Sequence, residues 1–188
     1  MITIKKYLEN SPLLFDGGMG TYYHSIASHP LERCEHANTK DEHSILRIHK
    51  DYIDAGAKAI KTNSFSLSQI AQEEGIETAQ TLAKAAWSIA ETASEGKDIF
   101  LFADFGPPAI QRDETLGIYK SLIDTFLSLG AKHFIFETFL NDTLIRPLAT
   151  YIREQDADAY IIASFAVLPD GFTAEGFFGP SMVDALLS

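Results

Sequence analysis

Short runs of apolar residues alternate along this chain with longer stretches in which apolar residues recur every three or four positions. The short runs are rich in β-branched and aromatic residues, which is typical of strands buried on both faces of a parallel sheet. Five strands are predicted on this basis, at Leu13–Phe15, Ala59–Thr62, Ile99–Ala103, His133–Phe136 and Tyr160–Ala163.

The longer stretches carry the periodicity and the end signals of amphipathic helices. Four are predicted, and a fifth begins near the end of the chain. They run from a capping box at Thr39–Glu42 to Gly56, over Thr78–Ser94, over Leu116–Leu129, and from a cap at Asn141 to about Glu154.

An internal repeat supports the alternation of strands and helices. Gly56–Phe65 and Gly130–Phe139 share Gly, Ala, Lys and Phe at the same offsets, and Gly96–Phe105 has the same separation of Gly and Phe. Repeated β/α units with right-handed crossovers form either a doubly wound sheet or a barrel. A barrel gathers the polar residues that follow its strands in one mouth, which favours it here. The polar residues that follow the five predicted strands are Asp16, Asn63, Asp104, Glu137 and Ser164.

The predicted fold is therefore α/β, a (β/α)8 TIM barrel of which this chain holds about the first five units. A complete barrel needs about 250 residues. Residues 1–188 are read as the N-terminal part of one barrel domain, with no internal boundary. An open section leaves its first and last strands as bare edges. We therefore expect self-association through these edges, or a missing piece supplied by another chain.

Composition and charge narrow the function classes. The chain has 188 residues and a formal net charge of −11, so it would repel a polyanion, and nucleic-acid binding is disfavoured. It contains one cysteine, which makes a disulfide framework within the chain impossible. We find neither a signal peptide nor a stretch apolar enough to cross a membrane, and we expect a cytoplasmic protein.

A glycine-rich segment, Asp16-Gly17-Gly18-Met19-Gly20-Thr21, follows the first predicted strand. Glycines let a backbone approach a ligand closely and expose N–H groups to an anion such as a carboxylate. The segment lacks the spacing of a Walker loop or of a dinucleotide-binding loop, so a nucleotide-binding domain is disfavoured. A flexible turn is the alternative.

Glu137 ends an apolar strand, where a carboxylate must find a partner or water. It would bind a substrate ammonium, act as a base, or form a structural ion pair with Lys61 or Lys132. Asn63 is either an amide of the site or the cap of a loop. These alternatives stay open at the level of the residues.

Metal binding by the histidines is disfavoured. His24, His29, His36, His43 and His49 lie near Cys34 in the sequence, but they show neither CxxC nor HExxH spacing. They are predicted to be solvated side chains.

Taken together, these stretches resemble the homocysteine S-methyltransferase family, which includes the homocysteine-binding module of cobalamin-dependent methionine synthase and betaine–homocysteine methyltransferase. The matches follow one another in order over nearly all of the chain. They are Asp16–Thr21, Cys34–Asn38, Tyr52–Ala57, Thr62–Phe65, Gly106-Pro107, Phe136–Phe139, Ser164-Phe165 and Asp170-Gly171.

The resemblance implies a (β/α)8 barrel that transfers a methyl group to the thiol of L-homocysteine and gives methionine. It implies a zinc ion that binds the thiol and lowers its pKa. Asp16, Gly17 and Gly18 would shape the substrate pocket, Glu137 would bind the substrate ammonium, and Asn63 and Ser164 would line the pocket.

The chain also differs from the family pattern in two respects. The family's zinc ligands are three cysteines after strands six and eight, which would lie C-terminal to Ser188, so we expect the 188-residue chain alone to lack activity. The usual Cys-Asn-Glu reads Cys34-Glu35-His36 here. The methyl donor is left open among methylcobalamin, folate-linked systems, S-adenosylmethionine, S-methylmethionine and betaine. The alternatives are a non-catalytic half-barrel that serves binding or assembly, and another barrel enzyme that uses Glu137 as a base.

Overall fold

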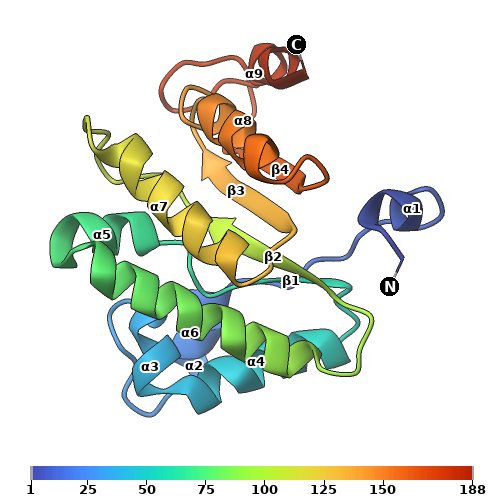
Figure 1. Cartoon of the computed structure of the whole chain (residues 1–188), viewed down its shortest axis with the longest axis vertical. Helices are drawn as coiled ribbons and strands as arrows, with labels where there is room; N and C mark the ends of the chain where they lie inside the picture. The colour runs from blue at the N-terminus through green and yellow to red at the C-terminus, as the bar shows by residue number, and fades with distance from the viewer. Residues whose placement is uncertain (1, 188) are drawn as a thin grey trace.

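The computed structural model describes residues 2–187 and shows an α/β arrangement on a parallel sheet (Figure 1). The strands are β1 (Ala59–Lys61), β2 (Phe100–Phe105), β3 (His133–Phe139) and β4 (Tyr160–Phe165). They are hydrogen-bonded in the order β1-β2-β3-β4, and every pair is parallel. A doubly wound sheet reverses its strand order at a switch point, whereas a barrel adds each new strand beside the previous one. The order found here is the one expected of a barrel section.

Helices connect the strands, and most of them cover one face of the sheet, while α1 lies on the other side (Figure 1). The helices are α1 (Ile4–Leu8), α2 (Met19–Ile26), α3 (Ala37–Lys40), α4 (Glu42–Asp54), α5 (Leu67–Glu74), α6 (Ile76–Ser94), α7 (Thr115–Ser128), α8 (Ile145–Gln155) and α9 (Gly179–Leu187). A 3-10 turn, η1 (Cys34–His36), precedes α3. The predictions for α6, α7 and α8 are confirmed within a few residues, whereas α1, α2, α3 and α5 were not predicted.

The predicted strand at Leu13–Phe15 is wrong as a strand. Only Phe15 forms an isolated parallel bridge, with Ala59. The adjacent N–H groups of Lys58 and Ala59 both donate to the Leu14 carbonyl, so the regular alternation of a parallel ladder is not established. The segment still runs beside β1 and therefore places the glycine-rich segment at the C-terminal end of the sheet.

Two predicted helix caps are also wrong. Thr39 lies inside α3, and its hydroxyl donates to the carbonyl of His36 at 3.3 Å, so it does not begin α4. The chain is already helical from Cys34 onward, and α4 starts anew at Glu42. Asn141 caps a turn instead of α8, because its Oδ1 accepts from the N–H of Thr143 and α8 begins later, at Ile145.

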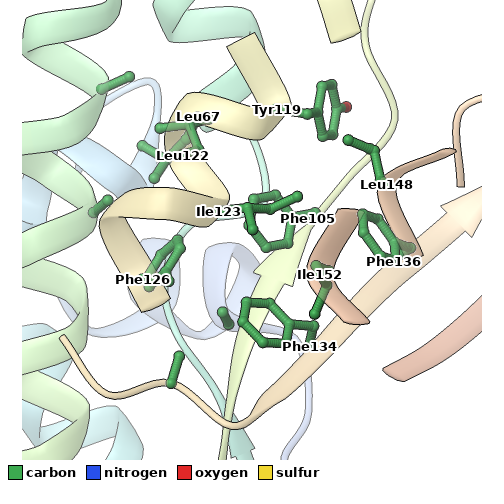
Figure 2. Close-up of a cluster of buried hydrophobic side chains, with 14 of the residues drawn as sticks. Leu67, Phe105, Tyr119, Leu122, Ile123, Phe126, Phe134, Phe136, Leu148 and Ile152 are labelled. Carbon is green, nitrogen blue, oxygen red and sulfur yellow. The ribbon is translucent and has the colours of Figure 1, made fainter. Parts of the chain in front are cut away.

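The core has one layer on each face of the sheet because side chains alternate along a strand. Toward the helices, Phe105, Phe134 and Phe136 pack against Tyr119, Leu122, Ile123 and Phe126 of α7 (Figure 2). On the opposite face, Phe100 and Phe102 of β2 and Ile135 of β3 pack with Ile4 of α1. The second face continues, at the C-terminal ends of the strands, into the polar residues described below.

The last strand is less covered than its neighbours. All six residues of β4 are half-buried, whereas five of the six residues of β2 are buried. Large apolar side chains after β4 are exposed, namely Val167, Leu168, Phe172, Phe177 and Phe178. Self-association through this edge stays a prediction. Among residues 2–187, no helix combines the length and the apolar character that crossing a membrane requires.

Candidate functional site

A cleft of about 460 Å³ lies at the C-terminal ends of the strands. Its wall combines the glycine-rich segment from Asp16 to Gly20, the end of β1, the end of β2 and the end of β3. Strand alternation explains why polar groups reach it. On the face that carries Ala59, Phe102 and Ile135, the next position along each strand is Lys61, Asp104 or Glu137. An apolar layer therefore supports a charged layer above it.

Lys61 is the cation of this charged layer. Its Nζ donates to both Oε1 and Oε2 of Glu137, at 3.1 Å each, and lies 3.8 Å from Oδ1 of Asp16. The backbone N–H of Lys61 also donates to Oδ2 of Asp16 at 2.9 Å. Glu137 thus has the structural ion pair with Lys61 that was one of its predicted alternatives, while Lys132 pairs with Asp156 instead.

Asp16 and Asp104 are strongly buried carboxyl groups in the cleft wall. The Asp16 side chain is 2% exposed, and burial raises its pKa to about 6 although Lys61 acts in the opposite direction. Burial, together with the nearby charge of Glu137, raises the pKa of Asp104 well above its usual value. Burial alone would lower the pKa of Lys61, but the charges of the three carboxylates outweigh it and raise that pKa. The site therefore favours the protonated, charged form of Lys61.

The glycine-rich segment begins a helix at the mouth of the cleft. Gly18 is the N-cap of α2, and among the described residues no side chain caps this end. The first N–H groups of a helix lack partners within the helix and attract anions. Gly17, Gly18 and Gly20 keep these N–H groups accessible from the cleft that they line.

Gly17 is required by a close approach to α4. A Cβ at this position would lie 2.7 Å from Oη and 2.9 Å from Cε1 of Tyr52. Tyr52 cannot move away freely, because its hydroxyl donates to the Gly18 carbonyl at 3.2 Å and its ring packs against Tyr22 at 5.7 Å. The glycine therefore keeps the wall of the cleft close to α4.

We predict that Gly17→Ala lowers the free energy of unfolding by about 2 kcal/mol, because overpacking displaces Tyr52. Gly117→Ala is the matched control, since Gly117 lies in α7 and its added Cβ would meet nothing within 4 Å among the described residues. That control should stabilise the protein by about 1 kcal/mol through helix propensity. Urea denaturation of both variants tests the prediction, and equal effects of the two substitutions would contradict it.

Asn63 holds a loop together at the edge of the cleft. Its Nδ2 donates to the Cys34 carbonyl at 2.7 Å and to Oδ1 of Asn38 at 2.8 Å, and its Oδ1 accepts from the Cys34 thiol at 3.1 Å. Asn38 in turn donates to the Asn63 carbonyl at 2.8 Å. Both amide protons of Asn63 are thus used within the protein. The geometry supports the loop-cap alternative. Asn63 forms part of the cleft wall, and its amide protons are not available to a ligand.

A bulge in β3 turns two consecutive residues toward the cleft. Phe136 pairs with Ala163 and Phe139 with Phe165, so Glu137 and Thr138 together oppose one residue of β4. Thr138 has a φ of 60°, in the left-handed region that L residues rarely adopt. The bulge lets Phe136 and Phe139 both pack toward the helices while Glu137 and Thr138 both line the cleft.

The structure brings together most of the predicted site residues. Asp16, Gly17, Gly18, Asn63 and Glu137 all line the cleft. Ser164 is half-buried in β4 and is not part of that lining, although alternation places it on the same face as Ile162. Lys61 and Asp104 are among the further residues that line the cleft, and neither was predicted to be a site residue. Asp104 was visible as a polar residue after a strand, whereas Lys61 read as part of one.

The residues of this chain do not fit a zinc ion by themselves. No three His, Cys, Asp or Glu side chains in residues 2–187 are placed to hold a metal. Burial raises the pKa of the Cys34 thiol, which donates a hydrogen bond to Asn63, so this sulfur is not a ready thiolate ligand. Of the histidines, His49 is not solvated as predicted but fully buried in α4, while His43 is exposed.

The fold and this cleft can now be compared with known proteins. The family model for homocysteine S-methyltransferase matches residues 13–183. The chain belongs to the homocysteine S-methyltransferase family. This confirms the resemblance drawn from the sequence motifs.

Solved structures agree at the level of the fold. The metallated form of the homocysteine methyltransferase MmuM from Escherichia coli superposes with a TM-score of 0.77 at 18% identity, covering 96% of this chain and 72% of that one. The oxidized form gives a TM-score of 0.80 at 18% identity, with 98% and 72% covered. The apo form gives 0.75 at 21% identity, with 96% and 69% covered. Comparison with curated protein sequences found no match.

Proposed function

We propose that the cleft binds L-homocysteine as the amino-acid site of a methyltransferase that methylates the homocysteine thiol and gives methionine. Family membership supports this reaction, and the observation that carries the assignment to the cleft is Glu137, whose carboxylate faces the cleft and already binds an ammonium group, that of Lys61. The helix N-terminus at Gly17–Gly20 lies in the same wall and suits the α-carboxylate.

In this proposal the described residues bind and orient the amino acid. Glu137 accepts hydrogen bonds from the substrate ammonium, and the N–H groups near Gly18 donate to its carboxylate. The thiol of the oriented substrate loses its proton to solvent, and the resulting thiolate attacks the methyl group of the donor. The bond from the methyl carbon to the donor breaks, and the donor keeps that electron pair. Residues 2–187 contain no group of three His, Cys, Asp or Glu side chains placed to bind a metal, so their proposed role is confined to the amino acid.

We further propose that the complete fold is a (β/α)8 barrel. The consecutive order of parallel strands supports a (β/α)8 barrel in which β1 to β4 and the Phe15 bridge form one section. A role of Glu137 as a general base is less well supported, because both of its oxygens already accept from Lys61. The methyl donor stays open at this level.

Calorimetric titration with L-homocysteine tests the proposed function. We expect saturable binding to the wild-type chain, and we predict that Glu137→Gln weakens it at least about tenfold, the size of one lost charge-assisted hydrogen bond. Glu91→Gln on the exposed face of α6 is the matched control and should bind like the wild type. Absence of saturable binding, or equal affinities for the two variants, would refute the assignment.

A further inference from the structure

Lys61 occupies the position in which a ligand ammonium would bind. Its Nζ sits 3.1 Å from each carboxylate oxygen of Glu137, which is the geometry that an amino-acid ammonium would adopt there. Its side chain is 15% exposed and lines the cleft with that of Glu137. Two ammonium groups cannot both occupy the position in which one nitrogen contacts both carboxylate oxygens. A ligand ammonium that takes this position must therefore displace Lys61.

The same cleft contains two further carboxyl oxygens that could receive Lys61. Oδ1 of Asp16 and Oδ1 of Asp104 are buried, and neither accepts a hydrogen bond from any residue between 2 and 187. Nζ of Lys61 is already 3.8 Å from Oδ1 of Asp16, about an ångström beyond a charge-assisted hydrogen bond. Buried carboxyl groups without partners are costly. A move of Lys61 toward these two oxygens would give them a hydrogen-bond donor.

We infer that Lys61 is a built-in competitor for the ammonium subsite, held by Glu137 when the cleft is empty and transferred to Asp16 and Asp104 when a ligand ammonium arrives. This inference rests on the proposed function, because it concerns how that site takes up an amino acid. The flexible four-carbon stem of lysine permits the shift without movement of β1. The backbone N–H of Lys61 stays bonded to Oδ2 of Asp16, which keeps the receiving carboxyl in place.

The inference predicts an unusual direction for a substitution in a binding site. Removing the competitor frees Glu137 and makes the cleft more negative by one charge, so a cationic group should bind more tightly. Lys61→Met keeps the apolar stem and removes the charge. We expect it to bind L-homocysteine about tenfold more tightly than the wild type.

A different role for Lys61 gives the opposite result. If Lys61 contacted the carboxylate of the ligand, Lys61→Met would weaken the binding of L-homocysteine. Two analogues separate the roles: decarboxylated homocysteine, which keeps the ammonium, and deaminated homocysteine, which keeps the carboxylate. As a competitor, Lys61 should hinder the first, so Lys61→Met should tighten binding of the decarboxylated analogue as well as that of L-homocysteine.

The experiment is calorimetric titration of the full chain with these three ligands. Lys61→Gln serves as a second neutral variant in case Lys61→Met fails to fold, which thermal unfolding will show. Lys58→Met is the matched control, because it removes the same charge from the protein at a position outside the cleft. Lys58 precedes β1, and its Nζ donates to the Asp98 carbonyl at 3.5 Å. Its affinity for L-homocysteine should be that of the wild type.

Each outcome decides between the two proposals. Tighter binding of both ammonium ligands to the neutral Lys61 variants, with Lys58→Met unchanged, supports the inference. Unchanged or weaker binding to these variants, while Glu137→Gln binds at least about tenfold more weakly than the wild type, overturns the inference and leaves the proposed function standing. Failure of the wild type to bind L-homocysteine at all overturns both.

Discussion

Asp16→Asn should stabilise the protein by about 3 kcal/mol at pH 8 while removing a charge from the proposed substrate site. Burial raises the pKa of Asp16 to about 6 from the ordinary value of 3.8. Above pH 6 the folded protein must therefore hold a buried charge that the unfolded chain exposes to water. Each unit of pKa difference corresponds to about 1.4 kcal/mol, which gives the predicted magnitude. Asparagine has nearly the same shape and does not ionise.

The stabilisation should depend on pH with a definite sign. Between pH 3.8 and pH 6 the folded state binds a proton at Asp16 that the unfolded state has released, so wild-type stability falls as pH rises through this window. Asp16→Asn lacks this titration. The difference between the variant and the wild type should therefore be largest above pH 6 and below about 1 kcal/mol at pH 4.

Urea denaturation at pH 4 and pH 8 measures this difference. Asp113→Asn is the matched control because Asp113 is exposed in the loop before α7, and its substitution should have little effect at either pH. If Asp16→Asn proved less stable than the wild type at pH 8, the attraction between Asp16 and Lys61, 3.8 Å apart, would outweigh the cost of burial. A stabilised variant with weakened homocysteine binding would show that the cleft retains Asp16 at the expense of stability.

The sequence predicted the strands well where their apolar runs were strong. β2, β3 and β4 begin within one residue of their predicted starts, and each extends two or three residues further than predicted. In β2 and β3 the first residues beyond the predicted ends, Asp104 and Glu137, are polar and line the cleft. A hydrophobic pattern stops at such residues, whereas the hydrogen-bonded ladder continues.

The short helices were not predictable in the same way. α2 begins at Met19, between Gly18 and Gly20, where the sequence carries no helix start signal. α5 follows Ser66, whose spacing to Gln69 is that of a capping box, but the Ser66 side chain makes no capping hydrogen bond. They are held by tertiary contacts instead. In the case of α5, Leu67 and Ile70 enter the large core cluster, and Oε1 of Glu35 accepts from the N–H of Ser66 just before the helix.

The candidate site was predictable in most of its residues, whereas the ion pair of Glu137 with Lys61 was only one of the alternatives that the sequence left open. Polar residues after strands identified Asp16, Asn63 and Glu137, because parallel strands end at the same edge of a sheet. That Lys61 pairs with Glu137 while Asn63 turns inward to hold Cys34 depends on which face each side chain takes. The bulge at Glu137 and Thr138 requires a left-handed backbone at Thr138. Threonine has no preference for that conformation, so the sequence does not predict the bulge.

His49→Leu should stabilise the protein, and more so in acid. His49 is fully buried in α4, and neither of its ring nitrogens has a hydrogen-bond partner among residues 2–187. A buried polar group without a partner costs about 1 to 3 kcal/mol, so leucine should gain about 1 kcal/mol at pH 7. Burial also lowers the pKa of His49 to about 4 from the ordinary value of 6.5. Between pH 6.5 and about pH 4, His49 therefore binds a proton in the unfolded chain but not in the folded protein.

This linkage makes the wild type lose stability as pH falls from 6.5 toward 4, by about 2 kcal/mol between pH 7 and pH 5. The titration of Asp16 makes the protein more stable as the pH falls over much of the same range. The two effects therefore oppose each other, and the free energy of unfolding of the wild type should change little with pH. Asp16→Asn should therefore expose the acid lability of His49, and adding His49→Leu should remove it. Urea denaturation from pH 7 to pH 5 tests this, with His43→Leu on the exposed side of α4 as the control. A steep slope that persists in the double variant would place the acid lability elsewhere.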